Sequence, residues 1–428
     1  MKDVTVIILA AGKSSRCWPL GDKNLLSFFG KPLINYQIEK LKSLGFGRIV
    51  LVLNENNYKH LEKMGVEKVI QKGDGQQSAI LSCRDKIKSG PALVVNANDF
   101  YDDELFEKMV KEIDKGDDDL ILVGKKMEDY FPGGYMVKDE EGYLKTIIEK
   151  PGEGNEPSNL VRIVTDYFKD ISDYYQICNG ERKDCLYEVT LQKMADEKKV
   201  RVLTYDGYWG YLKYPWHVLM LTEHFLKGVK RKISKDANVS DKAIILGEVE
   251  IASGVRVFEN AKIVGPCYIG ENTVIGNNVI LRRSIVEKEC VLGYSTDMAR
   301  SYIGPNCWFH SNYVGDSVLA GEVSFGAGTV FANLRLDERE IGSVIKGGKI
   351  NTKMTKYGGV IGSGVRVGVN CSIMPGVKIG QGSFIGAHVL VDRDIADRKY
   401  VGVLQKQEIL KNRTKVDIQE RNRYKEKI

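Results

Sequence analysis

The feature that most constrains the fold is a six-residue repeat that begins near residue 240. Aliphatic residues stand six positions apart through two long runs, separated by a stretch where the spacing is irregular. Neither an α-helix nor a hairpin has this period, whereas a hexapeptide β-solenoid places one inward aliphatic residue on each of three short faces per coil. We therefore expect a solenoid over residues 240–400. The repeat positions are Ile245, Ile251, Val257, Ile263, Ile269, Ile275 and Leu281, then Ile361, Val367, Ile373, Ile379, Ile385 and Val391; the irregular stretch contains Ile303, Phe309, Leu319, Phe325 and Phe331.

The N-terminal part has a different pattern, in which apolar runs alternate with amphipathic segments. Such alternation predicts a mostly parallel sheet with helices on both faces. Ligands bind beyond the carboxyl ends of the strands in these sheets, so the loops after Ala11 and Asn96 are the places to look. The expected strands are 4–11, 48–53, 68–71, 92–96 and 120–124, and the expected helices are 33–44, 79–87 and 104–113.

The change of pattern divides the chain into an α/β domain over 1–228, a solenoid over 240–400 and a charged tail over 401–428. The whole chain carries a formal charge of +6. Residues 405–428 contribute eight Lys or Arg and four Asp or Glu, so +4 of that charge lies in the tail. The nearly neutral remainder argues against a nucleic-acid-binding protein.

Cysteine usage and hydropathy indicate where the protein acts. The eight cysteines are scattered and no pair has Cys-x-x-Cys spacing, which disfavours both a zinc site and a disulfide framework. No apolar run approaches the roughly 18–20 residues that span a bilayer, and 4–11 is read as a buried strand. We expect a cytoplasmic protein without a membrane partner.

The segment over residues 9–20 reads Leu-Ala-Ala-Gly-Lys-Ser-Ser-Arg-Cys-Trp-Pro-Leu and follows the first expected strand. It contains Gly-Lys-Ser, but the P-loop pattern needs a glycine where Ile7 stands. Backbone N–H groups of such a loop can hold phosphates. Arg16 can bind a pyrophosphate with two donors, and Lys23 can neutralise a phosphate as a point charge.

This segment resembles the signature of the sugar-1-phosphate nucleotidylyltransferase family, and Lys23 with the downstream Gly-Lys-Pro over 30–32 fixes the alignment. The resemblance implies attack of a sugar 1-phosphate on the α-phosphate of a nucleoside triphosphate, with release of pyrophosphate. It assigns Arg16 and Lys23 to catalysis and Asp99, in Asn-Ala-Asn-Asp, to Mg²⁺ binding. It also implies nucleotide contacts at Ala10, Ala11, Gly12, Lys13, Ser14, Gln71, Gly75 and Gln76, and sugar contacts at Gly134, Glu149 and Lys150.

Three positions depart from the pattern of that family. Gln76 stands where the family has threonine, and the segment from Arg162 to Val164 replaces an Asn-x-Gly motif near the sugar. Tyr211 stands four residues before Pro215, where the family has a second metal-binding carboxylate or amide. A tyrosine is a poor Mg²⁺ ligand at neutral pH.

A second constellation lies in the irregular part of the repeat, where His-Ser-Asn-Tyr-Val-Gly-Asp over 310–316 precedes Gly-Ala-Gly-Thr over 326–329 and Ala-Asn-Leu over 332–334. It resembles the acetyltransferase domain of bacterial bifunctional N-acetylglucosamine-1-phosphate uridylyltransferase/glucosamine-1-phosphate acetyltransferases and, still more, of the archaeal sugar-1-phosphate nucleotidylyltransferase/acetyltransferases. A histidine titrating near neutral pH suits an acetyl transfer in which an ammonium loses its proton. The resemblance implies His310 as the catalytic base, Tyr313, Asn333 and Lys356 as sugar-binding residues, and the backbone at Ala387 as a contact to acetyl-CoA.

Taken together, the resemblance implies a Rossmann-like α/β nucleotidyltransferase domain followed by a left-handed parallel β-helix, in a homotrimer or a dimer of trimers. The sequence departs from the family at Ala299, where a phosphate-binding lysine is expected. Arg300 is the neighbouring cation. We expect a bifunctional enzyme that uses Mg²⁺ and acetyl-CoA. Two alternatives remain open: a nucleotidylyltransferase whose solenoid serves only for assembly, and a regulatory protein with a decayed site, which Tyr211, Arg162 and Val164 would favour.

Overall fold

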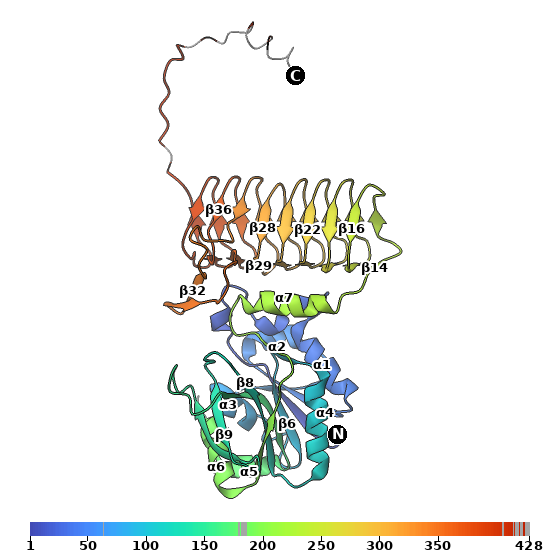
Figure 1. Ribbon diagram of the computed structural model, residues 1–428, viewed down its shortest axis with the longest axis vertical. Coiled ribbons are helices and arrows are strands. Elements are labelled where there is room, and N and C mark those ends of the chain that lie inside the picture. The colour runs from blue at the N-terminus through green and yellow to red at the C-terminus, as the bar shows by residue number, and fades with distance from the viewer. Residues whose placement is uncertain are drawn as a thin grey trace.

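The α/β domain and the solenoid form two bodies that lie one above the other in Figure 1, with helix α7 (His217–Lys227) between them. The computed structural model describes residues 1–62, 64–178, 180, 186–404, 406–413, 415, 419 and 423. The fold class is the predicted one, a Rossmann-like domain followed by a left-handed parallel β-helix. No helix among the described residues has the length and apolar character that crossing a membrane requires.

The central sheet of the α/β domain is mixed rather than mostly parallel. Strand β1 pairs in parallel with β4 and β6, and β5 extends this parallel part beyond β4. Strand β11 runs antiparallel to β6, β8 and β9, a reversal that the repeating pattern of the sequence did not predict. The strands are β1 (Thr5–Leu9), β4 (Arg48–Leu53), β5 (Glu67–Ile70), β6 (Ala92–Asn96), β8 (Leu120–Lys126), β9 (Gly134–Lys138), β10 (Leu144–Glu149), β11 (Leu160–Phe168) and β12 (Val200–Thr204).

Helices cover both faces of this sheet, as predicted. Along β1, Ile7 and Leu9 belong to one apolar core while Val6 and Ile8 belong to another, because successive side chains of a strand point to opposite faces. The helices are α1 (Leu33–Ser43), α2 (Glu55–Leu61), α3 (Gly75–Leu81), α4 (Asp103–Lys115), α5 (Ile171–Ile177) and α6 (Tyr187–Glu197).

The predicted strands and helices are present, but the helix expected over 79–87 is displaced. It is α3, which ends at Leu81 and continues as turns, with the Cys83 N–H donating to Ile80 O and the Ile87 N–H donating to Cys83 O. Residues Leu81, Cys83 and Ile87 are buried in these turns, so the apolar spacing imitates a longer helix.

Three parallel sheets form the solenoid, one for each face of the coil, and every described pairing within them is parallel. All the repeat positions named above except Ile245, which is partly buried and packs against it, belong to one continuous core. The first sheet contains β14 (Lys232–Ile233), β17 (Val249–Ile251), β20 (Cys267–Ile269), β23 (Ile285–Val286), β26 (Tyr302–Ile303), β29 (Val318–Leu319), β34 (Val360–Ile361) and β37 (Lys378–Ile379). The second contains β15 (Asn238–Val239), β18 (Arg256–Val257), β21 (Val274–Ile275), β24 (Val291–Leu292), β27 (Trp308–Phe309), β30 (Ser324–Phe325), β35 (Arg366–Val367), β38 (Phe384–Ile385) and β40 (Tyr400–Val401); the third contains β16 (Ile244–Leu246), β19 (Lys262–Val264), β22 (Ile280–Arg282), β25 (Asp297–Ala299), β28 (Tyr313–Gly315), β31 (Val330–Phe331), β36 (Ser372–Ile373) and β39 (Leu390–Val391).

The irregular spacing has two structural causes. Some coils have a shorter turn, so that the core position after Leu281 is Val286 and not residue 287. In addition, β31 pairs directly with β36, so residues 332–357 leave the coil and return to it. This insertion carries the hairpin of β32 (Gly342–Ile345) and β33 (Gly348–Asn351), which projects from the solenoid beside the α/β domain in Figure 1.

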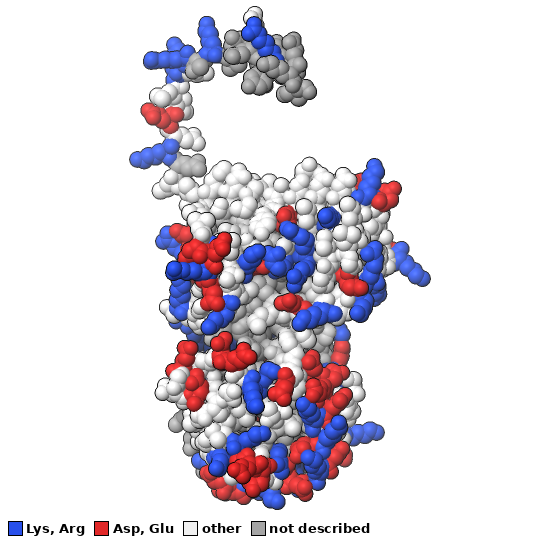
Figure 2. All heavy atoms as spheres, in the orientation of Figure 1, with Lys and Arg blue, Asp and Glu red and all other residues white. Residues whose placement is uncertain are grey.

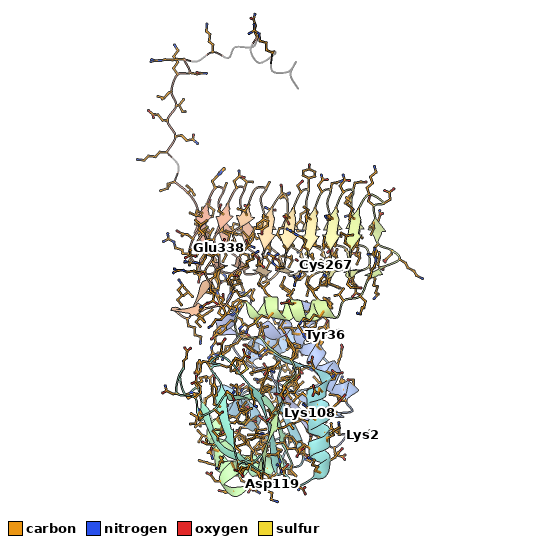
Figure 3. The ribbon with its side chains drawn as sticks, viewed as in Figure 1. Lys2, Tyr36, Lys108, Asp119, Cys267 and Glu338 are labelled. Carbon is orange, nitrogen blue, oxygen red and sulfur yellow. The ribbon has the colours of Figure 1, made fainter. Side chains whose placement is uncertain are left out.

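The two bodies are joined by a shared apolar core around α7. Val218 and Leu221 of this helix pack with Tyr302 and Val360 of the solenoid and with Phe28 from the hairpin of β2 (Ser27–Phe28) and β3 (Lys31–Pro32). The Tyr302 hydroxyl donates to Ser27 O at 2.6 Å. In Figure 3, Tyr36 and Cys267 lie on the two sides of this junction.

The chain leaves the last coil as an exposed segment. Residues 402–404 and 406–413 have no helix or strand, and Figure 2 shows basic side chains along this part of the chain. Most of the predicted tail beyond residue 413 lies outside the described residues.

Candidate active sites

A cavity of about 920 Å³ opens where β1 and β6 end, at the carboxyl edge of the parallel part of the sheet. Leu9 and Ala11 line it from the first strand and the loop that follows, and Asn96 and Asp99 line it from the second. The cavity brings together twelve of the residues that the sequence pointed to. They are Ala11, Gly12, Lys13, Arg16, Lys23, Gln71, Gly75, Gln76, Asp99, Gly134, Glu149 and Lys150.

Ala10 and Ser14 do not line the cavity and instead shape its loop. Ala10 is buried, and its carbonyl oxygen accepts hydrogen bonds from the Nδ2 atoms of Asn24 and Asn57 at 3.2 and 2.8 Å. Ser14 has φ of 51°, in the left-handed region, and its Oγ accepts a hydrogen bond from the Lys23 N–H at 3.3 Å. These contacts hold the loop after β1 against the segment that carries Lys23.

Cationic side chains gather on one wall of the cavity. The Lys23 Nζ donates to Leu212 O at 2.9 Å, and burial lowers the pKa of this amine. Lys213 was not predicted as a site residue, yet its Nζ lies in the same wall and donates to Pro132 O at 2.6 Å. Burial, with the charges of Arg16 and Lys150, lowers the pKa of Lys213 to about 7. The position of Lys213 beside Pro215 in the aligned motif was the signal that could have revealed it.

Asp99 is the carboxylate of this wall and is only 3% exposed. Its oxygens accept hydrogen bonds from Asn96 Nδ2 at 3.2 Å, from Asn98 Nδ2 at 3.3 Å and from the Tyr101 hydroxyl at 3.3 Å. Burial raises the pKa of Asp99 to about 6. The carboxylate therefore sits in a site that favours an added positive charge.

The donor set limits how a metal ion could bind here. In the described part of the chain, no three His, Cys, Asp or Glu side chains are grouped so that they could hold a metal ion. Mg²⁺ commonly takes one or two carboxylates and completes its shell with water and substrate phosphates. Asp99 fits such an ion, provided that the phosphates of a bound nucleotide supply most of the remaining ligands.

The residues expected to contact a sugar lie near Lys213, whose Nζ reaches Pro132 O and whose pKa is affected, besides burial, by the charges of Lys150 and Glu149. Gly134 pairs with Glu149 across β9 and β10, and Lys150 Nζ lies 2.5 Å from Glu149 Oε1. Lys13 and Asp74 form an exposed ion pair of 2.8 Å near the mouth, a kind of contact that adds little stability.

Two of the departures from the family pattern meet in this region. Arg162 is buried and its Nη2 donates to Gln76 Oε1 at 3.3 Å and to Glu188 Oε1 at 2.6 Å. Its Nη1 donates to Asp166 Oδ2 at 2.6 Å. The sequence did not indicate Glu188, because the contact joins segments far apart in the chain.

The solenoid places Tyr313 and Asn333 in contact. The Asn333 Nδ2 lies 3.3 Å from the Tyr313 hydroxyl and also donates to Asp316 Oδ2. Arg300 binds both oxygens of Asp316, with Nε at 2.6 Å and Nη2 at 2.7 Å. Ala299 is buried, whereas the side chain of its neighbour Arg300 is partly exposed.

His310, Lys356 and Ala387 are arranged around this group. The exposed His310 lies between β27 and β28, where its N–H donates to Asn312 Oδ1 and its carbonyl accepts from Thr296 Oγ1. Lys356 forms a bridge with Leu334, so it lies beside Asn333 where the insertion begins and ends. Ala387 follows β38, three strands along the second sheet from β27, or about 14 Å at the usual strand spacing. One chain therefore does not bring Ala387 next to His310.

Comparisons with known proteins cover nearly the whole chain. Residues 6–167 match the family model of the MobA-like NTP transferase domain, and residues 358–393 match that of the bacterial transferase hexapeptide (six repeats). A bifunctional sugar-1-phosphate nucleotidylyltransferase/acetyltransferase of Sulfurisphaera tokodaii is 34% identical over 91% of this chain and 97% of its own. A bifunctional protein GlmU of Methanococcus vannielii is 30% identical over 92% of this chain and 96% of its own. Among solved structures, an apo UDP-glucose pyrophosphorylase is 20% identical with a TM-score of 0.46, over 53% of this chain and 98% of that one.

Proposed function

The chain belongs to the family of bifunctional sugar-1-phosphate nucleotidylyltransferase/acetyltransferases, and from this premise we propose how its two domains work. The α/β domain joins a sugar 1-phosphate to a nucleotide and releases pyrophosphate. The solenoid acetylates an amino-sugar phosphate with acetyl-CoA. The alternatives of an assembly platform and of a decayed site receive no support from these relatives.

In the nucleotidyl transfer, an oxygen of the sugar 1-phosphate attacks the α-phosphorus and the bond to the pyrophosphate oxygen breaks. Negative charge builds up on the leaving group, so positioned cations lower the barrier. We assign Arg16 to the leaving pyrophosphate, Lys23 to the α-phosphate, and the N–H groups of residues 11–13 to the triphosphate. Their shared location in the cavity at the ends of β1 and β6 is the observation that carries this assignment.

We assign Asp99 to Mg²⁺, which would screen the triphosphate when bound. The buried position of this carboxylate beside Asn96 and Asn98 supports the assignment. Glu149, Lys150 and the backbone at Gly134 would hold the sugar, and Gln71, Gly75 and Gln76 would hold the base and ribose, since they line the other parts of the same cavity.

In the acetyl transfer, the amine of the sugar attacks the thioester carbonyl, the bond to sulfur breaks, and the nitrogen gives up a proton. We assign the proton to His310, since an exposed imidazole can accept it and release it to water. Tyr313, Asn333 and Lys356 would orient the sugar phosphate, and the backbone at Ala387 would contact the acyl donor. The estimated 14 Å between the coils of Ala387 and His310 favours a donor site shared between copies, so we propose a trimer or a dimer of trimers.

The cytoplasm is the compartment we propose. Seven cysteines in the described part of the chain are free and buried, which suits a reducing compartment.

Pyrophosphate release with Mg²⁺ tests the first activity, with five nucleoside triphosphates screened against a panel of sugar 1-phosphates. Acetyl-CoA consumption with hexosamine 1-phosphates tests the second. Pyrophosphate release with one pair of substrates identifies the nucleotide and the sugar. If folded protein releases no pyrophosphate with any pair, the transferase assignment is contradicted.

A further inference from the structure

Glu188 is a cavity-lining carboxylate that the family signature does not include. It is the second residue of α6 and is only 7% exposed. Arg162 engages its Oε1 at 2.6 Å, while Oε2 accepts no hydrogen bond from any residue that the structure describes. Because Glu188 lines the cavity, an oxygen without a protein donor is an acceptor available to a ligand there.

Hydrogen bonds position both Arg162, which binds Glu188, and the helix that carries Glu188. Arg162 also donates to Asp166 Oδ2. The same oxygen accepts a hydrogen bond from the Tyr187 hydroxyl at 2.8 Å. Gln192, one turn further along α6, accepts a hydrogen bond from the Ile147 N–H of β10 at 2.9 Å. This hydrogen bond joins the helix that carries Glu188 to the strand that carries Glu149.

Glu188 and Glu149 flank the same glycine. A Cβ built at Gly134 would lie 3.4 Å from Glu188 Cγ and 3.5 Å from Glu149 Oε2. Arg162, Asp166 and Glu188 together carry a net charge of −1 when all are ionised, and Arg162 and Glu188 line the same cavity as Arg16, Lys23 and Lys213. A sugar 1-phosphate lying with its phosphate toward these cations could place its ring at the glycine that Glu149 and Glu188 flank.

We propose that Glu188 is a second carboxylate of the sugar subsite and accepts a hydrogen bond at Oε2 from an O–H or N–H group on the ring of the sugar 1-phosphate. This inference rests on the proposed nucleotidyl transfer. Arg162 acts as a positioning residue, since it binds Glu188 and also donates to Gln76 Oε1 at 3.3 Å at the start of α3. Sugar and base selection are thereby linked through one guanidinium group.

The test compares the wild type with Glu188→Gln on a series of sugar 1-phosphates that each lack one hydroxyl group. Pyrophosphate release by the full chain is measured for every pair, as in a double-mutant cycle. Glutamine keeps the oxygen that accepts from Arg162 and turns the other atom from an acceptor into a donor. We expect kcat/KM to fall by about 10–100-fold for a sugar that has the donor group, with KM for the nucleotide within about twofold. For the sugar that lacks this one group, the variant and the wild type should differ by less than about threefold.

Further measurements distinguish an O–H donor from an N–H donor on the sugar and control for indirect effects of the substitution. Hydroxy, amino and N-acetylamino sugar 1-phosphates are compared at the position that the cycle identifies, and a cationic amine should show the largest loss in the variant. Glu197→Gln, on the exposed end of the same helix, should leave all these values unchanged. Arg162→Met should raise KM for both sugar and nucleotide, and Arg162→Lys should restore part of each.

If the loss caused by Glu188→Gln and the loss caused by removing a hydroxyl simply add at every ring position, Glu188 does not contact the sugar. The nucleotidyl transfer itself would stand. No release by the wild type with any sugar would overturn the transfer and this inference with it. Should Glu188→Gln lower the melting temperature, Glu188→Asp keeps the charge and shortens the reach by one methylene. It should then show the same position-specific loss, and a uniform loss would contradict the proposal.

Discussion

Tyr211 lies directly opposite Asp99 in the antiparallel pair formed by β13 (Trp209–Tyr211) and β7 (Asp99–Tyr101). Side chains at opposed positions of such a pair have Cβ atoms about 4.5–5.5 Å apart. The phenol therefore occupies the place from which a second carboxylate would reach an ion held by Asp99. The departure noticed in the sequence is thus a change within the proposed metal site itself.

Tyr211→Asp should lower the Mg²⁺ concentration that gives half-maximal pyrophosphate release, by about tenfold. Mg²⁺ sites commonly use one or two carboxylates with substrate phosphates, and the substitution supplies the second. Titration of Mg²⁺ at saturating nucleotide measures the change. Tyr211→Phe is the matched control and should leave the half-maximal concentration unaltered; an equal shift in both variants would count against the assigned metal site.

Lys23→Met should reduce pyrophosphate release by about 10²–10³-fold, the usual loss when one stabilising group of a transition state is removed. Acetyl-CoA consumption should stay within about twofold, since Lys23 lies in the cavity of the α/β domain and the residues proposed for acetyl transfer lie on the solenoid. Both activities are followed on the same preparation. If pyrophosphate release and acetyl-CoA consumption fell together, the two activities would not have independent sites.

His310→Asn should have the opposite effect and lower acetyl transfer by about 10²–10⁴-fold, the range typical of a lost general base. Pyrophosphate release should be unchanged. Exogenous imidazole can replace a missing side chain, so partial rescue of acetyl transfer is a second readout. If acetyl transfer survives in the variant, another group takes the proton.

The solenoid was predictable because its signal is local. Each coil repeats the same inward position, and residues such as Ile263 and Ile379 are buried for the same reason. The repeat did not reveal the length of the coils between Leu281 and Phe331, because deletion of one turn residue breaks the spacing without breaking the core. Strand β11 was not among the expected strands, and its uninterrupted burial gives no indication of strand direction.

Candidate site residues could be predicted where they lie close together in the sequence. Arg16 and Lys23 lie in one motif, and His310 and Tyr313 lie in another. Glu188 and Lys213 were not found, because their chemistry depends on contacts with Arg162 and Pro132 that lie far from them in the sequence. Gln76 and Arg162 look like unrelated departures in the sequence, yet a hydrogen bond joins them in the fold.

At Lys213, binding of a nucleoside triphosphate should take up close to one proton at pH 8 and only a small fraction of a proton at pH 6, where the amine is already charged. The pKa of Lys213 lies at about 7 because burial and the charges of Arg16 and Lys150 lower it, so the amine is mostly neutral at pH 8. A polyanion beside it restores the charged form. Nucleotide affinity should therefore weaken as the pH rises above 7. Calorimetric titrations in two buffers of different ionisation enthalpy, at both pH values, measure the uptake.

Lys213→Met should abolish most of this proton uptake, whereas Lys111→Met, an exposed lysine of α4, should not alter it. The same residue affects stability with a defined sign. The folded state binds fewer protons than the unfolded state between pH 7 and the ordinary lysine pKa of 10.5, so the contribution of Lys213 to stability increases across that window. Lys213→Met should accordingly raise the melting temperature of the free protein more at pH 6 than at pH 9. An equal change at both pH values would contradict the lowered pKa.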